Sequence, residues 1–204
     1  MTTAADPPLG RREQTKRANR ATILDAAREV FAELGYGAAS VRDIIRRTDL
    51  AAGTFYNYFP DKEAVFRALL DELALEVGGL TAQARANATT LDDFVEEGFR
   101  AFFVYLAEDP VRCELLRRNA GAVRSLFEGE AIEAVLTQLG ADLQRGIDAG
   151  LIPPHDTELM ATAMLGSAFE VGMRAAEREP VDVETATRLC ADIFLGGFAR
   201  MRVA

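Results

Sequence analysis

The sequence predicts an all-α protein, with a short three-helix unit at its N-terminal end and a larger helical body after it. Apolar side chains recur at helical spacing through most of the 204 residues, and no segment alternates apolar and polar residues as a half-buried strand would. Residues that start helices, such as Ser40, Thr90 and Asp156, precede the periodic segments, while glycine or proline follows them. These signals together predict about nine or ten helices.

The first predicted helix covers residues 17–34. Its apolar positions fall on one face, which carries Ile23, Ala27, Val30, Phe31 and Leu34. Gly35 is expected to end this helix, because glycine readily adopts the positive φ that follows a helix C-terminus. Ser40 then caps a short second helix, and a third short helix begins near Ala52 and ends before Pro60.

A long helix is predicted next, from Lys62 to Ala86, with a weak point at Gly78-Gly79. The rest of the chain divides into further helices wherever a cap or a breaker interrupts the apolar pattern. We expect these helices over residues 90–108, 111–119, 131–149, 156–178 and 182–202.

Charge is distributed unevenly along the chain. The net charge is −9, yet the first 62 residues hold ten basic and eight acidic side chains, and residues 11–20 hold five basic and one acidic. A small basic end on an acidic body is expected of a protein that contacts phosphate groups with one face. A solvated charge run on a frayed terminus is the alternative if the segment is considered alone.

Several classes of protein do not fit this composition. With 49% apolar and 27% charged residues the chain is globular, and it has neither a membrane-spanning apolar run nor a secretory signal, so we expect a cytoplasmic protein. Cys113 and Cys190 are isolated, and His155 is expected on a surface loop, so no metal site or cofactor is predicted. No nucleophile and base pair stands out, so we expect no enzyme.

The three N-terminal helices, with a tight turn between the last two, match a helix-turn-helix arrangement. In that motif the third helix lies in the DNA major groove. Such a helix should be short, with small residues at its leading end and polar groups that reach phosphate or base edges. The segment that begins at Ala52 meets this description, through Ala52, Gly53, Thr54, Tyr56 and Asn57.

Residues Arg20 to Leu70 resemble the DNA-binding domain of the tetracycline-repressor (TetR) family. The most specific part is the ordered block Gly-Thr-Phe-Tyr-x-Tyr-Phe-x-x-Lys-Glu, residues 53–63, and the similarity also covers Ile23 to Ala27, Phe31, Leu34 to Tyr36, Ser40 to Ile44 and Ala64 to Val65. The resemblance implies a transcriptional regulator that binds duplex operator DNA. The remaining three quarters of the chain match the family only in general pattern.

The resemblance also implies roles for individual residues. Phosphate contacts would come from the Ser40 hydroxyl, from Tyr56 and Tyr58, and from Lys62. Phe55 and Phe59 would lie in the core. Arg42, Gly53, Thr54 and Asn57 would lie nearest the base edges. Together with the basic segment, the DNA-contacting set is Arg17, Ser40, Arg42, Gly53, Thr54, Tyr56, Asn57, Tyr58 and Lys62.

The turn between the second and third helices departs from the family pattern. Asp49 stands where glycine is usual and would have to tolerate its left-handed conformation. Ala51 cannot cap the third helix with a side chain, which costs about 1 kcal/mol in typical hosts. Arg46 and Arg47 could add phosphate contacts, with solvent exposure as the alternative for at least one.

The helix over residues 90–108 is apolar on more than one face, as expected of a buried helix. Plain core packing is one interpretation. The other is a cavity for a small apolar or aromatic effector, such as a flat ring or an acyl chain. Its candidate lining is Phe99, Phe102, Phe103, Leu116, Val123, Phe127, Met160 and Met164, with Arg117, Asn119 or Glu170 as polar anchors.

The last two helices are rich in alanine and glycine, which allow helices to approach closely. They could form a four-helix interface with a second copy, or pack only within one chain. Dimerisation is favoured because a small helix-turn-helix generally acts on two half-sites.

These observations predict a flexible basic arm over residues 1–16, a helix-turn-helix domain over 17–62 and a ligand-binding and dimerisation domain over 63–204. The leading hypothesis is a repressor that binds a (pseudo)palindromic operator as a homodimer and is released by an apolar effector. The alternatives are an activator or a regulator without a ligand, a helical ligand-binding protein or enzyme with a vestigial DNA module, and a purely structural dimer.

Overall fold

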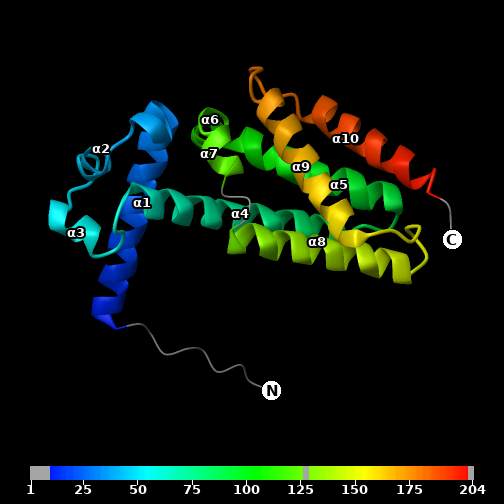
Figure 1. Cartoon of the computed structure of the whole chain (residues 1–204), viewed down its shortest axis with the longest axis horizontal. Coiled ribbons are helices and arrows are strands. Elements are labelled where there is room, and N and C mark those ends of the chain that lie inside the picture. The colour runs from blue at the N-terminus through cyan, green and yellow to red at the C-terminus, as the bar shows by residue number, and fades with distance from the viewer. Residues whose placement is uncertain (1–9, 126–128, 202–204) are drawn as a thin grey trace. The chain divides into compact units, whose positions relative to one another are not determined.

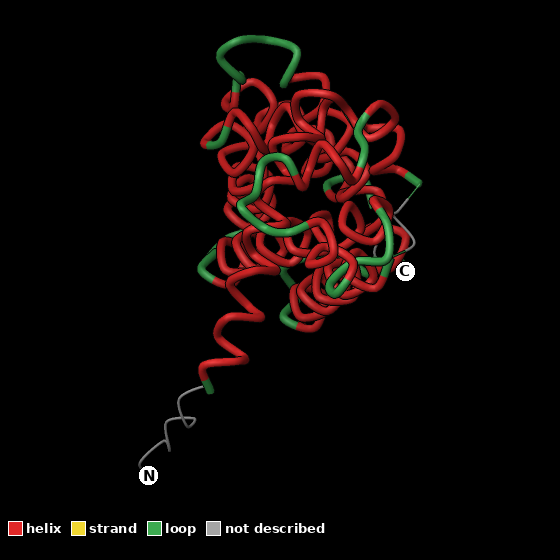
Figure 2. The backbone as a smooth tube through the Cα atoms, turned by 90° about the vertical axis from the view of Figure 1, so that its left-hand side faces the viewer, coloured by secondary structure: helices red, strands yellow, loops and turns green. Residues whose placement is uncertain are grey.

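A computed structural model describes residues 10–125 and 129–201 (Figure 1). These residues form ten α-helices and no strand, which confirms the all-α class (Figure 2). In chain order the helices are α1 (Arg11–Ala38), α2 (Val41–Ile45), α3 (Ala52–Tyr56), α4 (Lys62–Ala86), α5 (Leu91–Glu108), α6 (Pro110–Arg118), α7 (Ala120–Arg124), α8 (Glu130–Asp148), α9 (Thr157–Ala175) and α10 (Val183–Phe198).

The chain divides into two compact units, residues 1–69 and 70–204. The sequence had placed the domain boundary earlier, after residue 62. The reason for the difference lies in the first turns of α4, whose side chains Val65, Phe66 and Leu69 are buried. The ring of Phe66 packs edge-on against Phe31 of α1, with 5.0 Å between their centroids. The start of α4 therefore completes the core of the smaller unit.

Helix α1 begins earlier than the sequence predicted. It starts at Arg11, so residues 11–16, expected in a flexible arm, are helical, and residues 1–9 of that arm lie outside the described residues. The Gly10 carbonyl accepts the first hydrogen bond, from the Glu13 N–H at 2.9 Å. Arginine, glutamine and lysine favour helix, which explains how an exposed segment with little apolar content continues the helix.

The break in α1 lies where the sequence predicted it. Gly35 has φ 77° and ψ 154°, a combination that only glycine adopts readily, and the chain resumes a short helical turn before α2. Four of the five predicted platform residues are buried, while Leu34, immediately before the break, is 46% exposed.

In the larger unit α5 packs along α10 and α8 along α9, and α9 also contacts α5 and α10. Their common core contains Phe99, Phe103, Leu106, Leu143 and Phe194. The predicted caps are confirmed: the Thr90 hydroxyl accepts from the Asp93 N–H, and the Asp156 carboxylate accepts at the start of α9. The helix ends of this unit are therefore set by local sequence.

Two glycines mark places where helices of the larger unit come close together. A Cβ on Gly78 would lie 2.7 Å from Cγ2 of Val135 in α8, and a Cβ on Gly172 would lie 2.8 Å from Cδ1 of Leu106 in α5. The sequence analysis predicts a weak point at Gly78-Gly79, but helix α4 is continuous through these two residues. In the structure Gly78 is a site of close packing between α4 and α8.

Replacing Gly35 by Ala should destabilise the smaller unit. The φ and ψ of Gly35 are strained for any residue with a Cβ, at a cost of about 1–3 kcal/mol. Gly37→Ala is the matched control, because nothing lies within 4 Å of a Cβ there and its φ is ordinary. Thermal unfolding followed by circular dichroism measures the difference. Equal midpoints for the two variants would contradict the role assigned to the break.

Candidate nucleic-acid interface

A capping box holds the start of α2. The Ser40 hydroxyl oxygen accepts from the Asp43 N–H at 3.3 Å, and the Asp43 carboxylate accepts from the Ser40 N–H at 3.0 Å and its O–H at 2.5 Å. These bonds, with the hydroxyl contributing most, lower the pKa of Asp43 below its usual value. The hydroxyl hydrogen of Ser40 is therefore donated within the chain, so the predicted phosphate contact of this hydroxyl would have to replace its bond to Asp43.

Helix α3 is anchored by aromatic rings on one side and open on the other. Phe55 and Phe59 are 1% and 5% exposed, which confirms that both are core. On the opposite side Gly53, Tyr56 and Asn57 are exposed, and Tyr56 is 59% exposed. Thr54 and Tyr58 are half-buried. The face of α3 that carries small, hydroxyl and amide groups is thus the face available to a partner.

The turn between α2 and α3 is held differently from the prediction. Among the described residues no side-chain-bearing residue has a positive φ, so Asp49 does not adopt the left-handed conformation of the usual glycine. Thr48 stabilises the turn instead: its hydroxyl donates to the Ile45 carbonyl at 2.9 Å and accepts from the Leu50 N–H at 3.3 Å. A threonine before a short loop is a known turn signal that the sequence interpretation missed. Ala51 lacks a side-chain cap, as predicted.

The two arginines of this turn have different environments. Arg47 donates to Glu29 at 3.0 Å and to Glu33 at 2.8 Å, and it ties the end of α2 back to α1. Its hydrogen bonds lower the pKa of Glu33. Arg46 is 71% exposed at its side chain, with Asp43 at 4.0 Å. Arg46 is therefore the arginine whose charge a phosphate can reach, while that of Arg47 is largely neutralised.

Lys62 lies at the start of α4 and points into the turn that follows α1. Its ammonium donates to the backbone carbonyls of Tyr36 at 2.7 Å, Gly37 at 3.3 Å and Ala39 at 2.9 Å. The same nitrogen lies 4.7 Å from the centroid of the Tyr36 ring. An ammonium group has three N–H donors, so all of them have acceptors inside the protein. The phosphate contact implied by the family resemblance would have to replace one of these bonds.

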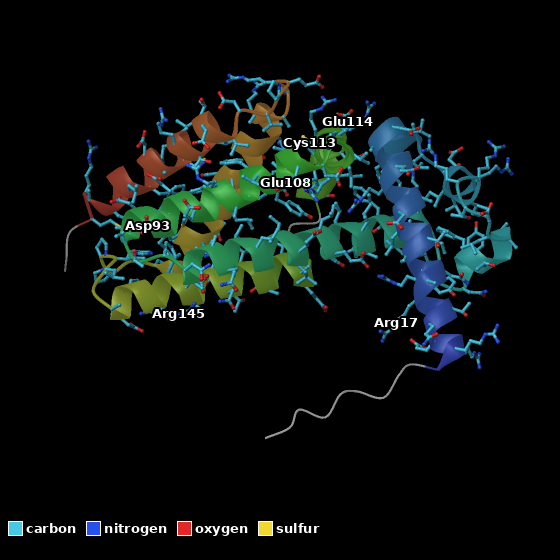
Figure 3. All side chains as sticks on the ribbon, turned by 180° about the vertical axis from the view of Figure 1, so that it is seen from behind. Arg17, Asp93, Glu108, Cys113, Glu114 and Arg145 are labelled. Atoms are coloured by element: carbon cyan, nitrogen blue, oxygen red, sulfur yellow. The ribbon has the colours of Figure 1, made fainter. Side chains whose placement is uncertain are left out.

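A groove runs between the first turns of α1 and the end of α3. It is lined by Arg12 and Lys16 from α1 and by Asn57 and Tyr58 after α3, together with Gly10, Glu13 and Thr15. Arg17 lies on the same turns of α1 (Figure 3), its side chain 67% exposed and 3.9 Å from Glu13. Basic side chains and the polar end of α3 thus share one side of the smaller unit, and Arg42 is exposed on α2.

The larger unit contains a small cavity of about 60 Å³. Three of the predicted lining residues are there, Phe99, Phe102 and Met164. Four others do not line it: Phe103, Leu116 and Val123 are buried in the core and Met160 is half-buried, while Phe127 lies outside the described residues. The sequence missed Arg85, a single arginine at the wall of the cavity.

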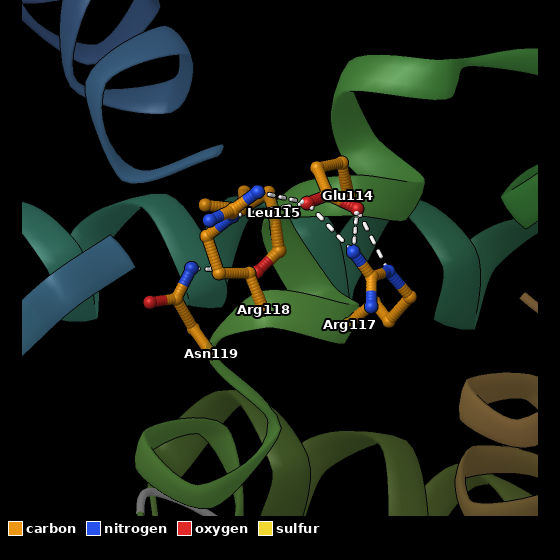
Figure 4. A network of polar contacts seen from close by, with 5 residues as sticks. All are labelled: Glu114, Leu115, Arg117, Arg118 and Asn119. Atoms are coloured by element: carbon orange, nitrogen blue, oxygen red, sulfur yellow. Dashed lines mark hydrogen bonds and ion pairs between the residues drawn. The ribbon is translucent and has the colours of Figure 1, made fainter. Parts of the chain in front are cut away.

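None of the predicted polar anchors faces this cavity. Arg117 donates to Glu114 at 2.7 and 2.8 Å, Arg118 shares the same carboxylate, and Asn119 donates to the Leu115 carbonyl (Figure 4). Glu170 accepts from Arg124 at 2.5 and 2.6 Å on the surface. Arg117 therefore stabilises α6, and Asn119 stabilises the C-terminal end of that helix. Glu170 stabilises the contact between α7 and α9.

In the part of the chain that the structure describes, no three His, Cys, Asp or Glu side chains cluster as metal ligands would. His155 is half-buried, with its Nδ1 2.8 Å from the Pro153 carbonyl oxygen. Both cysteines are free thiols, and burial raises the pKa of Cys190 to about 11. None of the described helices combines the length and the apolar content needed to cross a membrane.

Residues 23–69 match the family model described as bacterial regulatory proteins, tetR family. This match coincides with α2, α3 and the helices that hold them, and confirms the resemblance drawn from the block over residues 53–63. Over these residues the chain is similar to the tetR family of bacterial regulatory proteins. TetR-family proteins are bacterial regulators, so the exposed face of α3 and the adjoining groove form the candidate DNA interface.

Solved structures extend the likeness to the whole chain. The fatty acid degradation regulator FadR from Bacillus halodurans aligns with a TM-score of 0.77 and 25% identity, over 96% of this chain and 100% of that chain. FadR from Bacillus subtilis, solved in complex with stearoyl-CoA, aligns with a TM-score of 0.75 and 23% identity, over 87% of this chain and 98% of that chain. A TetR-family transcriptional regulator from Pectobacterium atrosepticum aligns with a TM-score of 0.71 and 23% identity, over 93% of this chain and 97% of that chain. The larger unit thus has the fold of TetR-family bodies.

Replacing Lys62 and Arg46 by Ala should affect DNA binding in different ways. Loss of Lys62 removes charged hydrogen bonds worth about 1.5–3 kcal/mol and should lower the unfolding midpoint, with no change in the salt dependence of DNA affinity. Loss of the exposed Arg46 should leave the midpoint unchanged and reduce the slope of log K against log salt by about one unit.

Fluorescence anisotropy with one DNA duplex at several salt concentrations, and thermal unfolding, separate the two effects. Lys62→Arg serves as the charge-preserving control. A shallower salt slope for Lys62→Ala would show that Lys62 leaves its carbonyl acceptors and contacts phosphate.

Proposed function

We propose that this protein is a ligand-responsive repressor of the TetR family, which binds a (pseudo)palindromic operator as a homodimer and is released by a small, largely apolar effector. The observation that carries the proposal is the open polar face of α3 beside the basic groove, in a unit that matches the family's DNA-binding domain. The proposed activity is binding alone, in the cytoplasm, where operator DNA lies.

The proposed DNA contacts divide into two groups. Arg12, Lys16, Arg17 and Arg46 supply positive charge to phosphates, and with Tyr56 and Tyr58 they fix orientation. Sequence is read by side chains that reach base edges in the major groove, where amide and guanidinium groups pair with purines. That second group is Arg42, Gly53, Thr54 and Asn57.

Two copies are proposed to pair through α9 and α10. Both helices leave large apolar side chains on the surface, with Leu189 50% and Ile193 56% exposed on α10 and Leu159 68% exposed on α9. Such exposure is costly in water and is reduced by pairing with a second copy. A dimer would present two α3 helices to half-sites about 34 Å apart, one turn of the duplex.

The effector is proposed to enter the cavity of the larger unit, whose walls carry Phe99, Phe102 and Met164. A fatty-acyl group is one candidate, because the similar FadR from Bacillus subtilis was solved with stearoyl-CoA. The volume of about 60 Å³ suits a short chain, and a longer one requires side chains to move. Release from DNA requires a coupling free energy of only about 1–3 kcal/mol between effector binding in the cavity and DNA binding by the smaller unit.

DNA selected from a random pool should contain two inverted half-sites. Sedimentation of the purified complex should give two chains for each duplex, and combining Leu189→Asp with Ile193→Asp should convert the protein to a monomer with weaker DNA binding. The reason is that two charges would be buried in the proposed interface. Selected DNA without repeated half-sites, or a double variant that still dimerises, would contradict the homodimer.

Asn57→Ala should relax sequence preference at one position of each half-site. If the exposed amide of Asn57 pairs with a base, its loss costs about 1–3 kcal/mol against the preferred base and little against the others. Asn87→Ala, an exposed asparagine after α4, is the control and should leave the profile unchanged. Binding to all single-base variants of the selected site gives the profile. A uniform loss for Asn57→Ala would place this residue against phosphate instead.

A further inference from the structure

The cavity of the larger unit has one charged side chain in its wall. Arg85, near the end of α4, has 7% of its side chain exposed. The other wall positions are filled by apolar, threonine and glycine residues, among them Phe99, Phe102 and Met164. A guanidinium remains protonated in proteins, so this part of the cavity carries a full positive charge.

A carboxylate holds the guanidinium from one side only. The Nε–H of Arg85 donates to Asp142 of α8 at 2.8 Å, and Asp142 is 3% exposed at its side chain. Among the residues that the structure describes, Nη1 and Nη2 of Arg85 have no hydrogen-bond acceptor. The Nη1 atom lies against Gly98 of α5, 3.9 Å from where a Cβ would be, and Gly98 itself lines the cavity. The forked end of the guanidinium is thus unpaired at the cavity.

The charges around Asp142 do not balance. Asp142 also accepts from Gln138 at 2.7 Å and pairs with Arg145 of α8, which Figure 3 labels. Two guanidinium groups therefore share one carboxylate, although that of Arg145 is 64% exposed to water. Burial lowers the pKa of Arg85, and Asp142 opposes this. A buried cation with spare donors is costly unless a further anion pairs with it.

A purely structural ion pair would be built differently. A guanidinium that serves only to join two helices pairs most strongly through two parallel N–H groups. Here the carboxylate takes the single Nε–H, which fixes the plane of the guanidinium and leaves its end free. That end has the geometry for two parallel hydrogen bonds to the oxygens of another carboxylate.

We propose that Arg85 is the anchor for the carboxylate of a small apolar carboxylic acid, whose hydrocarbon part occupies the cavity between Phe99, Phe102 and Met164. Asp142 is the positioning residue, since it orients Arg85 and does not line the cavity. This inference rests on the proposed ligand-responsive function and narrows its effector to an anion with an apolar chain. Chains beyond a few carbons require Met164 or Phe102 to change rotamer, which the flexible thioether allows.

The test compares three probes that share an eight-carbon chain: octanoate, 1-octanol and octanoyl-CoA. Isothermal titration calorimetry on the full-length protein should show octanoate binding about tenfold or more tightly than octanol, because a charged hydrogen bond is lost in the alcohol. Arg85→Met should abolish this preference. Arg145→Met is the matched control, since Arg145 contacts the same carboxylate but is 64% exposed, and it should retain the preference.

Folding of the variants is checked by thermal unfolding. Arg85→Met leaves Asp142 buried with fewer partners, so the double variant Arg85→Met with Asp142→Leu is measured too, because removing both members of a buried pair is tolerated far better than removing one. A folded double variant that binds octanoate as the unaltered protein does would overturn the anchor. Equal binding of octanoate and octanol, or binding of octanoyl-CoA alone, would do so as well. So would the failure of both octanoate and the four-carbon butanoate to bind, since the shorter chain suits the volume of the cavity.

A separate DNA-binding measurement distinguishes this inference from the proposed function. Octanoate that binds through Arg85 without weakening DNA affinity supports the anchor and counts against a ligand-responsive repressor. Release of DNA by octanoyl-CoA, unchanged in Arg85→Met, supports the repressor and overturns the anchor.

Discussion

The break in α1 at Gly35 is the constraint on which the smaller unit depends. After the break the backbone carbonyls of Tyr36, Gly37 and Ala39 converge on the ammonium of Lys62. The ring of Tyr36 packs on Phe66, with 4.7 Å between the centroids. The turn that leads into α2 is therefore fixed against the start of α4, and the capping box at Ser40 begins from a defined position.

This arrangement explains why the positive charge of the N-terminal end is not all available to DNA. Lys62 and Arg47 satisfy carbonyls and carboxylates within the unit, where they hold helices together. Arg12 and Lys16 line the groove beside α3, and Arg46 extends from the turn. Charge that positions α2 and α3 and charge that faces a partner are thus carried by different residues.

The larger unit combines close helix packing with a buried ion pair. Gly78 and Gly172 let α4 approach α8 and α9 approach α5, and the cavity lies among these helices. The Arg85–Asp142 pair joins α4 to α8 at the cavity wall. A polar pair in apolar surroundings favours one arrangement of the helices, because other arrangements leave its charges unpaired.

The sequence by itself determined the features that depend on near neighbours. The helical class, the caps at Ser40, Thr90 and Asp156, the break at Gly35 and the burial of Phe55 and Phe59 follow from spacing and local backbone chemistry. The predicted start of α1 was wrong by six residues, because the exposed residues 11–16 carry little apolar pattern and are helical through residue types that favour helix.

Only the tertiary structure decided which charges are paired and where the cavity lies. Lys62 finds its carbonyl acceptors 23 to 26 residues away, and Arg85 meets Asp142 across 57 residues. Arg117 and Glu170, expected as anchors, pair on the surface instead. The sequence alone does not distinguish an arginine that is solvated from one that is paired or one that lies at a cavity wall. Its partner is set by how the helices pack, because hydrogen bonds and desolvation act over a few ångströms of space and not along the chain.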